Sequence, residues 1–235
     1  MNNNLILKQK QTKISNKNRF KEIRKSLTLP KYLNDALIGI MLGDGYLYRS
    51  SLTSNTRLEC SLKEANLAYA LYIYALFIHY IGSKPNILNT ASSSGDKTYG
   101  SIRLKTLSLP VFNYYHDLFY FRDSNKQKWI KKVPENINDL MSPVVLAFLL
   151  MGDGNYDINR KRIRIFTNSF THSETILLAE AIKYKLNINA SVLYDRKDQY
   201  IITIGAKQIS LLQELVLEHF HPSMFYRIGL PNKTI

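Results

Sequence analysis

The chain has 235 residues, of which 45% are hydrophobic and 11% aromatic, so it can bury a sizeable core as one large domain or two smaller ones. Its 32 Lys and Arg residues against 18 Asp and Glu residues leave a formal net charge of +14, which indicates a polyanionic partner such as nucleic acid. No apolar run reaches the roughly 18 residues that a membrane-spanning helix needs, so we expect no membrane partner. The single cysteine, Cys60, excludes an internal disulfide framework and a cysteine-rich zinc site.

Residues 1–29 are basic and polar and show no sustained hydrophobic period, which predicts a flexible arm before the first apolar segment. A disordered tail and an arm that contacts phosphates are both compatible with this composition. The segment lacks the apolar region of a secretory signal and is unlike an Arg- and Ser-rich transit peptide. The abundance of Asn, Lys, Ile and Tyr in the whole chain is typical of proteins from AT-rich genomes, such as organellar ones.

One pattern occurs twice. LNDALIGIMLGDGYLY, from Leu33, aligns without a gap with SPVVLAFLLMGDGNYD, from Ser142, at a constant offset of 109 residues (153 − 44). Each copy is an apolar run that ends in Gly-Asp-Gly, and Ser142 followed by Pro143 is typical of a helix start. Gly39 and Gly43 lie four residues apart on one helix face, where another backbone can approach closely. We therefore predict two buried helices that pack against each other.

After each predicted helix, polar and apolar residues alternate, as in strands with one exposed face. Such strands are predicted at residues 57–63, 101–105, 162–168 and 191–204, the last being a hairpin that turns at residues 195–198. Helical patterns occupy residues 65–82, 109–121, 171–186 and 209–220. Each half thus has the order helix, two strands, helix, two strands, helix. This is an α+β fold in duplicate, with halves at 30–122 and 140–235 and a polar linker at 123–139.

Asp44 and Asp153 end the two apolar runs, so packing the helices side by side would bring both carboxylates to one end. One Gly-Asp-Gly alone is typical of a simple helix stop. Two acidic residues at neighbouring helix C-termini are disfavoured by the macrodipoles and by each other, and a cation would relieve both penalties. The carboxylates, with backbone carbonyls of Gly43 and Gly152, suit Mg²⁺, which also takes phosphate oxygens as ligands. The sequence therefore predicts metal-dependent phosphodiester hydrolysis.

LIGIMLGDG and LAFLLMGDG resemble the two copies of the motif that names the LAGLIDADG homing endonucleases. The element order, KKVP at 131–134 and HPSMFYRI at 221–228 resemble single-chain members, so the resemblance covers the chain from about Leu33 onward. It implies an antiparallel β saddle of two pseudo-symmetric α-β-β-α-β-β-α halves, packed through the motif helices, that binds double-stranded DNA as a monomer. Asp44 and Asp153 would be the catalytic metal-binding carboxylates.

The resemblance further implies Mg²⁺ as cofactor, with Mn²⁺ as a substitute. One phosphodiester would be hydrolysed in each strand of a long recognition site, leaving 3′ overhangs and initiating intron homing. Together with the composition, it predicts an organellar, mitochondrial location.

Family members often place a basic residue near each active centre. Lys131 stands at this place in the first half, with Lys132 as the alternative, and Arg227 stands there in the second half. The usual residue at the second place is lysine, and arginine keeps the charge but cannot act as a base. Phe148 aligns with Gly39, which implies that the two helices do not approach each other symmetrically.

The exposed faces of the predicted strands carry the side chains that we expect over the DNA. Arginine can bind guanine edges with two hydrogen bonds, whereas lysine more often contacts phosphate. A solvated strand face is the alternative for each of them. The basic candidates are Arg57, Lys63, Arg103, Lys105, Arg162, Arg164, Arg196 and Lys197, and the polar candidates are Glu59, Ser61 and Asn168.

The main alternative function is an RNA-binding intron maturase, a splicing cofactor on the same fold whose partner is intron RNA. The presence of both motif aspartates favours the nuclease without excluding a dual role. A DNA-binding regulator on this fold is disfavoured, because neither motif acid is lost and no helix-turn-helix pattern is present.

Overall fold

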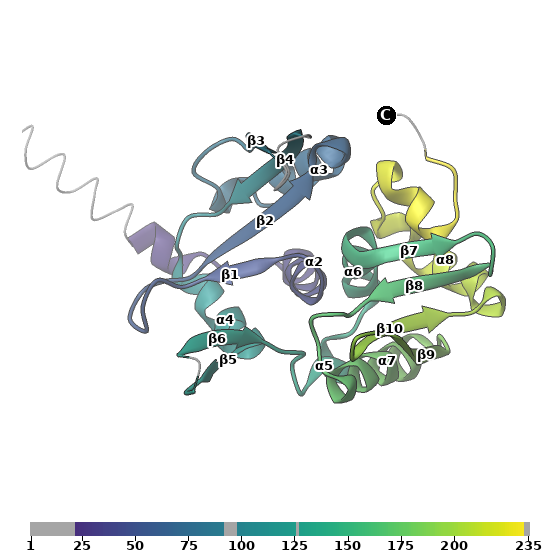
Figure 1. The fold of residues 1–235 in the computed structure, drawn as a ribbon. Helices are drawn as coiled ribbons and strands as arrows, with labels where there is room; N and C mark the ends of the chain where they lie inside the picture. Colours follow the sequence, from purple (N-terminus) through teal and green to yellow (C-terminus); the bar gives the residue numbers. More distant parts are fainter. Residues whose placement is uncertain (1–21, 92–97, 126, 233–235) are drawn as a thin grey trace, which may run out of the picture.

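The computed structural model describes residues 22–91, 98–125 and 127–232, and it contains two similar halves on either side of a central helix pair (Figure 1). The predicted α+β fold of two α-β-β-α-β-β-α halves is confirmed. The first half consists of α2 (Lys31–Leu42), β1 (Tyr46–Tyr48), β2 (Arg57–Lys63), α3 (Leu67–Leu76), β3 (Asn86–Ala91), β4 (Thr98–Lys105) and α4 (Asn113–Phe119). The second half consists of α6 (Pro143–Asp153), β7 (Gly154–Asp157), β8 (Arg162–Phe166), α7 (His172–Leu186), β9 (Ala190–Arg196), β10 (Gln199–Ile204) and α8 (Ile209–Val216).

Each half contains one four-stranded antiparallel sheet, and the two sheets have the same topology. The strand order is β1-β2-β4-β3 in the first half and β7-β8-β10-β9 in the second. One face of each sheet packs on helices, and its inward residues, such as Ile102, Leu104, Ile163 and Ile165, are buried. The other face carries the polar residues of β2 and β8, as the period of two requires.

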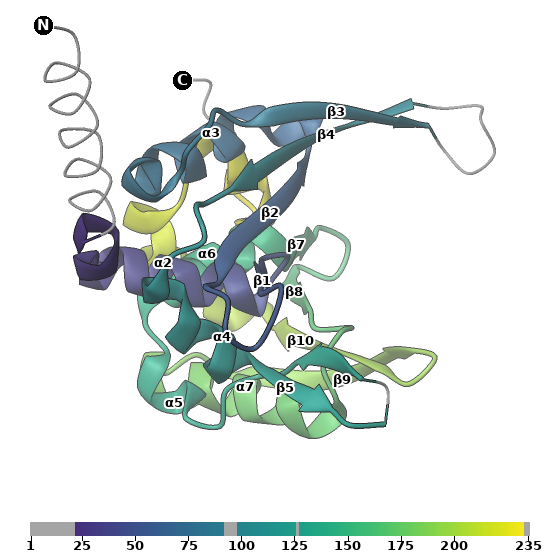
Figure 2. The same cartoon turned by 90° about the vertical axis from the view of Figure 1, so that its left-hand side faces the viewer.

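Helices α2 and α6 pack directly against each other and form the contact between the halves (Figures 1 and 2). A Cβ atom on Gly39 would lie 2.5 Å from the carbonyl oxygen of Val145 and 2.7 Å from Cβ of Phe148, so no larger residue fits there without a backbone shift. The ring of Phe148 stacks on Tyr72, with centroids 6.1 Å apart, and meets Tyr32 edge-on. The glycine of one helix thus faces the aromatic residue of the other, which is the expected asymmetric approach.

A buried carboxylate joins α2 and α6 near the N-terminal ends of both helices. Asp35 is 5% exposed and accepts hydrogen bonds from Ser142 Oγ and Lys31 Nζ, each at 3.0 Å. Ser142 also accepts a hydrogen bond from the backbone N–H of Val145 and so caps α6. Asp35 therefore ties α2 to the N-terminus of α6.

The segment at 123–139, which the sequence predicts as a polar linker, contains regular secondary structure. It contains β6 (Lys128–Lys131), which pairs with β5 (Tyr120–Asp123), and the short helix α5 (Ile137–Leu140). The helix predicted over 109–121 ends at Phe119, because Tyr120 and Phe121 belong to β5. Of the basic arm predicted at 1–29, residues 1–21 lie outside the described residues, and residues 22–26 are helical.

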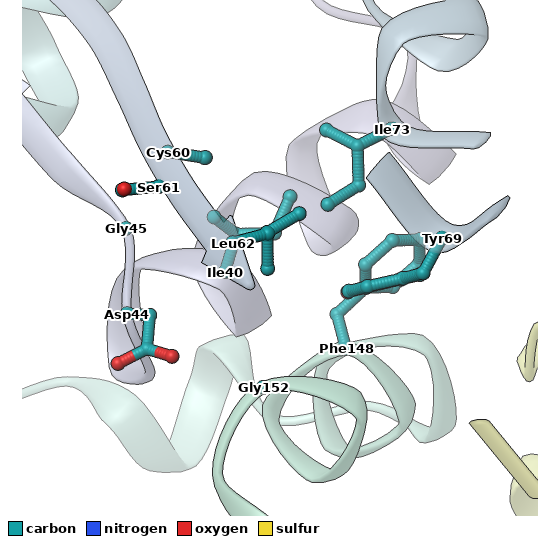
Figure 3. Close-up of a pocket in the computed structure, with 10 residues that line it drawn as sticks. All are labelled: Ile40, Asp44, Gly45, Cys60, Ser61, Leu62, Tyr69, Ile73, Phe148 and Gly152. Carbon is teal, nitrogen blue, oxygen red and sulfur yellow. The ribbon is translucent and has the colours of Figure 1, made fainter. Parts of the chain in front are cut away.

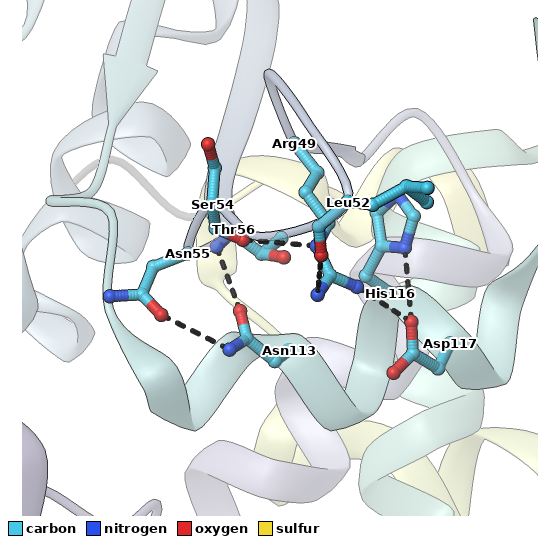
Figure 4. A network of polar contacts seen from close by, with 8 residues as sticks. All are labelled: Arg49, Leu52, Ser54, Asn55, Thr56, Asn113, His116 and Asp117. Carbon is cyan, nitrogen blue, oxygen red and sulfur yellow. Dashed lines mark hydrogen bonds and ion pairs between the residues drawn. The ribbon is translucent and has the colours of Figure 1, made fainter.

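The loop between β1 and β2 is held against α4 by a polar network (Figure 4). Arg49 donates to the carbonyl oxygens of Ser54 and Leu52, and its guanidinium forms an ion pair of 2.9 Å with Asp117. The side chain of Asn113 accepts a hydrogen bond from the backbone N–H of Thr56 at 2.9 Å. The loop at the outer end of the sheet is thereby fixed to the core of its half.

Replacing Gly39 with alanine should destabilise the chain by about 1–3 kcal/mol, because the new methyl group meets backbone of α6 rather than a flexible side chain. Urea unfolding measures this loss. Gly205→Ala is the matched control, since no atom lies within 4 Å of the position of its Cβ, and it should leave stability unchanged or slightly raised. Equal stability of the two variants would contradict the close packing of α2 on α6.

Candidate active site

The two motif aspartates come together at one end of the central helix pair. Asp153 is the last residue of α6, and Asp44 follows α2 after the capping residue Gly43. A Cβ atom on Gly43 would lie 3.1 Å from Asp153 Oδ2, and one on Gly152 would lie 3.9 Å from the backbone nitrogen of Asp44. The small residues of each motif therefore make room for the acidic end of the other motif.

The closeness of the two carboxylates changes how Asp153 titrates. Burial and, to a smaller extent, the charge of Asp44 together raise the pKa of Asp153 from 3.8 to about 7. The charges of Lys131 and Arg227 act against this rise. A cation bound between the carboxylates would replace the missing solvent and offset their repulsion.

Lys131 and Arg227 occupy equivalent positions beside the two carboxylates. Lys131 Nζ donates to the carbonyl oxygens of Gly43 at 2.6 Å and Gly45 at 2.9 Å. Arg227 Nη1 donates to the carbonyl oxygen of Gly154 at 2.6 Å. Gly45 and Gly154 differ by the repeat offset of 109, so each basic residue binds the glycine that follows its own half's aspartate.

Lys131 and Arg227 differ in their protonation and in the hydrogen-bond donors that remain without a partner. Burial lowers the pKa of Lys131 to about 8, although Asp153 and Asp44 favour its charged form. Arginine stays charged at any working pH. Among the described residues, Arg227 Nε is a buried donor without a hydrogen-bond partner. Lys132, the alternative to Lys131, instead faces Glu135 at 3.4 Å.

The strand β6 and its flanks hold Lys131 in place. Lys131 pairs with Tyr120 of β5, and the next backbone N–H, of Lys132, donates to Phe119 at 2.7 Å. The N–H of Val133 donates to the side chain of Glu174 at the start of α7 at 3.2 Å. This contact between the linker and the second half was not visible in the sequence pattern, which showed Glu174 only as part of a helix.

The donor set fits a hard divalent cation. Within residues 22–91, 98–125 and 127–232, no group of three or more His, Cys, Asp or Glu side chains could hold a metal. The ligands from the chain would therefore be Asp44, Asp153 and backbone carbonyls. Gly43 O accepts from Lys131, but a carbonyl oxygen has a second lone pair. Because the protein supplies few ligands, coordination positions of the metal remain open for water and phosphate oxygens, as Mg²⁺ requires.

A pocket opens beside Asp44 between the two motif helices and β2 (Figure 3). Its walls are mainly apolar and include Ile40, Leu62 and Phe148, which reduce the access of water to this side of the carboxylate. Cys60 also lines it, and burial raises the pKa of its thiol to about 12. The thiol stays protonated, which excludes Cys60 as a nucleophile.

The polar face of the first sheet is organised around Glu59. Its carboxylate lies 2.7 Å from Arg57 Nε, 3.1 Å from Arg103 Nη2 and 3.8 Å from Lys105 Nζ, and Glu59 is only 8% exposed. These three ion pairs orient the basic side chains of this face, and the contact of Glu59 with DNA stays a prediction. Ser61 and Lys63 lie exposed on the same face.

The second sheet carries its predicted polar residues in smaller pairs. Arg162 forms an ion pair with Asp157 at 3.3 Å, and Arg164 donates to the side chain of Asn155 at 2.6 Å. Asn168 donates to Gln199 at 2.8 Å, so it sits beside the turn end of the β9–β10 hairpin. Arg196 ends β9, and Lys197 begins the turn, where Lys197 and Asp198 both have positive φ. The turn therefore lies within the predicted residues 195–198.

Asn155 and Asp157 were missed by the sequence reasoning, although they face the two predicted arginines. They lie on β7, a strand of four residues that is too short to show a period.

These features define a class of protein, namely a single chain with two fused copies of one α+β unit and an acidic centre at the contact of the copies. The chain matches the sequence profile of the LAGLIDADG DNA endonuclease family over residues 34–212. The chain belongs to this family, and the predicted family membership and nuclease class are confirmed.

The relatives agree with this assignment. The chain is 28% identical over 217 residues to the DNA endonuclease I-ChuI of Chlamydomonas applanata, covering 88% of this chain and 99% of that protein. It is 23% identical over 197 residues to the cytochrome b mRNA maturase bI2 of Saccharomyces cerevisiae. This match covers 82% of this chain and 46% of the maturase. The fold is similar to that of the homing endonuclease I-WcaI bound to its DNA recognition sequence, with a TM-score of 0.79, 24% identity and coverage of 89% of this chain and 92% of the other. None of the described helices is long and apolar enough to cross a membrane.

The raised pKa of Asp153 predicts how the metal-free protein responds to pH. Between about pH 4 and pH 7 the folded chain keeps a proton on Asp153 that the unfolded chain has lost, so stability falls as pH rises through this window. Asp153→Asn removes this cost. It should raise the free energy of unfolding at pH 8 by up to about 4 kcal/mol, the free energy that corresponds to the rise in the pKa of Asp153 from 3.8 to about 7, and leave it nearly unchanged at pH 4.

Urea unfolding in EDTA at the two pH values measures this difference. Asp139→Asn, an exposed aspartate of α5, is the control and should show no such pH dependence. A loss of stability at pH 8 in Asp153→Asn would contradict this account. It would show that the surrounding protein stabilises the ionised carboxylate of Asp153 without a bound cation.

Proposed function

We propose that Asp44 and Asp153 are the catalytic carboxylates of this DNA endonuclease, and that they hold Mg²⁺, with Mn²⁺ as a substitute. The observation that carries the proposal is the pairing of both carboxylates at the shared end of α2 and α6, with one basic residue beside each half. A cation bound there would supply Lewis acidity at the scissile phosphate and lower the pKa of bound water. Gly43 and Gly152 would lend backbone carbonyls as further ligands.

The remaining residues of the site would control charge and orientation. Lys131 fixes the carbonyl oxygens of Gly43 and Gly45 and so orients the turn that carries Asp44. Arg227 holds the carbonyl oxygen of Gly154 and so orients the backbone next to Asp153. Because Lys131 and Arg227 are cationic, they offset the charge that gathers on the phosphate in the transition state.

The two pseudo-symmetric carboxylates would each serve one DNA strand. One phosphodiester would be hydrolysed per strand within a long site, with 3′ overhangs and with initiation of intron homing as the biological result. The basic side chains on the exposed sheet faces would bind phosphates and base edges of the duplex. A single chain supplies both motifs, so the active form would be a monomer.

We also propose an organellar, mitochondrial location. It is supported by the Asn-, Lys- and Ile-rich composition and by similarity to a protein named for cytochrome b mRNA. The same relative is the observation that favours a second function, in which the chain binds intron RNA as a maturase.

Cleavage of a randomised duplex-DNA library in Mg²⁺, with recovery and sequencing of the ends, tests the proposed function. The chain should cut both strands at one long site and leave 3′ overhangs, and EDTA should abolish cutting. Asp44→Asn and Asp153→Asn should each reduce cleavage at least about 1,000-fold, in line with the loss of an essential catalytic group. The exposed Asp139→Asn should cleave like the wild type.

Retained cutting in both Asn variants would refute the assignment of the carboxylates. Absence of cutting by the wild type, together with tight binding to structured intron RNA, would refute the nuclease and favour the maturase.

A further inference from the structure

A row of apolar side chains crosses the exposed face of the second sheet. Ile201 of β10 pairs with Phe166 of β8 on one side and with Leu193 of β9 on the other. Phe166 is 37% exposed and Leu193 is 41% exposed, and Ile201 lies buried between them. Three cross-strand neighbours thus form one row, which we call the apolar row.

The apolar row lies on the face that carries the basic side chains. Phe166 and Arg164 are two residues apart on β8 and so point to the same side of the sheet, opposite the buried Ile165. The guanidinium of Arg164 lies 5.5 Å from the centroid of the Phe166 ring. The row is therefore continuous with the surface that the proposed function assigns to DNA.

The first half has polar residues at the equivalent places. Tyr46 pairs with Glu59, and its counterpart Asn155 pairs with Arg164, which sets the correspondence between the two sheets. Glu59 of β2 is therefore the counterpart of Arg164 of β8, and two residues further along each strand Ser61 is the counterpart of Phe166. The cross-strand neighbours of Ser61 then form the row that corresponds to the apolar row. Its members are Ser61, Arg103 and Asn86, which are exposed and are paired with one another in the same way.

The chemistry of the two rows limits what each can contact. Ser61, Arg103 and Asn86 carry hydrogen-bond donors and acceptors, which suit base edges and phosphates. Phe166, Leu193 and Ile201 have no polar atoms in their side chains, so they cannot bind phosphate or distinguish bases by hydrogen bonds. In the major groove, the apolar group that protrudes from a base edge is the C5-methyl group of thymine. Exposed apolar side chains gain from burial against such a group.

We propose that the exposed members of the apolar row, Phe166 and Leu193, contact thymine methyl groups in the major groove, and that this contact makes the second half of the chain specific for thymine at those positions. The inference rests on the proposed function, because it assumes that the exposed sheet faces lie on duplex DNA. The two halves then read their half-sites by different chemistry. The first half selects through hydrogen bonds and charge, and the second half selects through methyl contacts.

Deoxyuridine tests the proposal, since it pairs like thymidine and lacks only the methyl group. The cleaved site from the library is synthesised with deoxyuridine replacing thymidine in one half-site at a time, and binding is measured in Ca²⁺ or EDTA. In the half-site under the second sheet, each contacted methyl group that is removed should weaken binding about fourfold, the factor for burial of one carbon group. In the other half-site the change should stay within about twofold.

Variants assign the effect to the row. Phe166→Ala and Leu193→Ala should weaken binding to the thymidine duplex and should no longer distinguish it from the deoxyuridine duplex. Both side chains are exposed, so the variants should fold, which thermal unfolding checks. Ile87→Ala is the control, because Ile87 is an exposed apolar residue that pairs with the buried Ile102 and so belongs to the other sheet face.

Equal binding of the thymidine and deoxyuridine duplexes would overturn the proposal while leaving the nuclease intact. A selected half-site without thymine under the second sheet would overturn it as well. A chain that binds and cleaves no duplex would overturn the proposed function, and the proposal would fall with it.

Discussion

The close contact between α2 and α6 is the constraint on which the rest of the structure depends. Gly39 brings the backbone of α2 within van der Waals distance of α6, and Asp35 fastens the other end of the pair through Ser142. Each helix leads directly into the first strand of its own sheet, so the angle and spacing of the helices also fix the relative position of the two sheets. The same contact brings Asp44 and Asp153 together. The fold, the proposed DNA surface and the proposed catalytic centre are thus coupled through one helix pair.

The contact between the two helix ends carries an electrostatic cost, at the place where we propose that the metal binds. Two carboxylates meet where burial and mutual repulsion disfavour their charged forms, which the raised pKa of Asp153 reflects. Lys131 and Arg227 offset part of the cost through equivalent positions but with different chemistry. The asymmetry continues outward, from Gly39 facing Phe148 at the interface to a polar row on the first sheet and an apolar row at the equivalent place on the second sheet. A duplicated chain is free to diverge in this way when its target need not be palindromic.

The repeat offset of 109 residues made the helix pair, its glycines and both aspartates predictable, because identical short motifs at matched positions restrict the possible arrangements. The sequence predicted the strands of β2, β4 and β8, where alternation is long enough to read. It could not locate β1 or β7, which have three and four residues. It also could not show that the helix predicted over 109–121 ends at Phe119 and that a strand begins at Tyr120. The role of Glu59 depends on cross-strand register, which no local pattern contains. Lys131 was chosen over Lys132 by resemblance, and only the geometry separates the two.

The central claim is that both motif aspartates serve one metal-binding centre at the end of the helix pair. Anomalous X-ray scattering from crystals of the chain with its DNA site and Mn²⁺ tests this claim most directly. We expect Mn²⁺ peaks in contact with the carboxylates of both Asp44 and Asp153 and with the scissile phosphates. Mn²⁺ bound away from one or both carboxylates, with the DNA in place, would contradict the account.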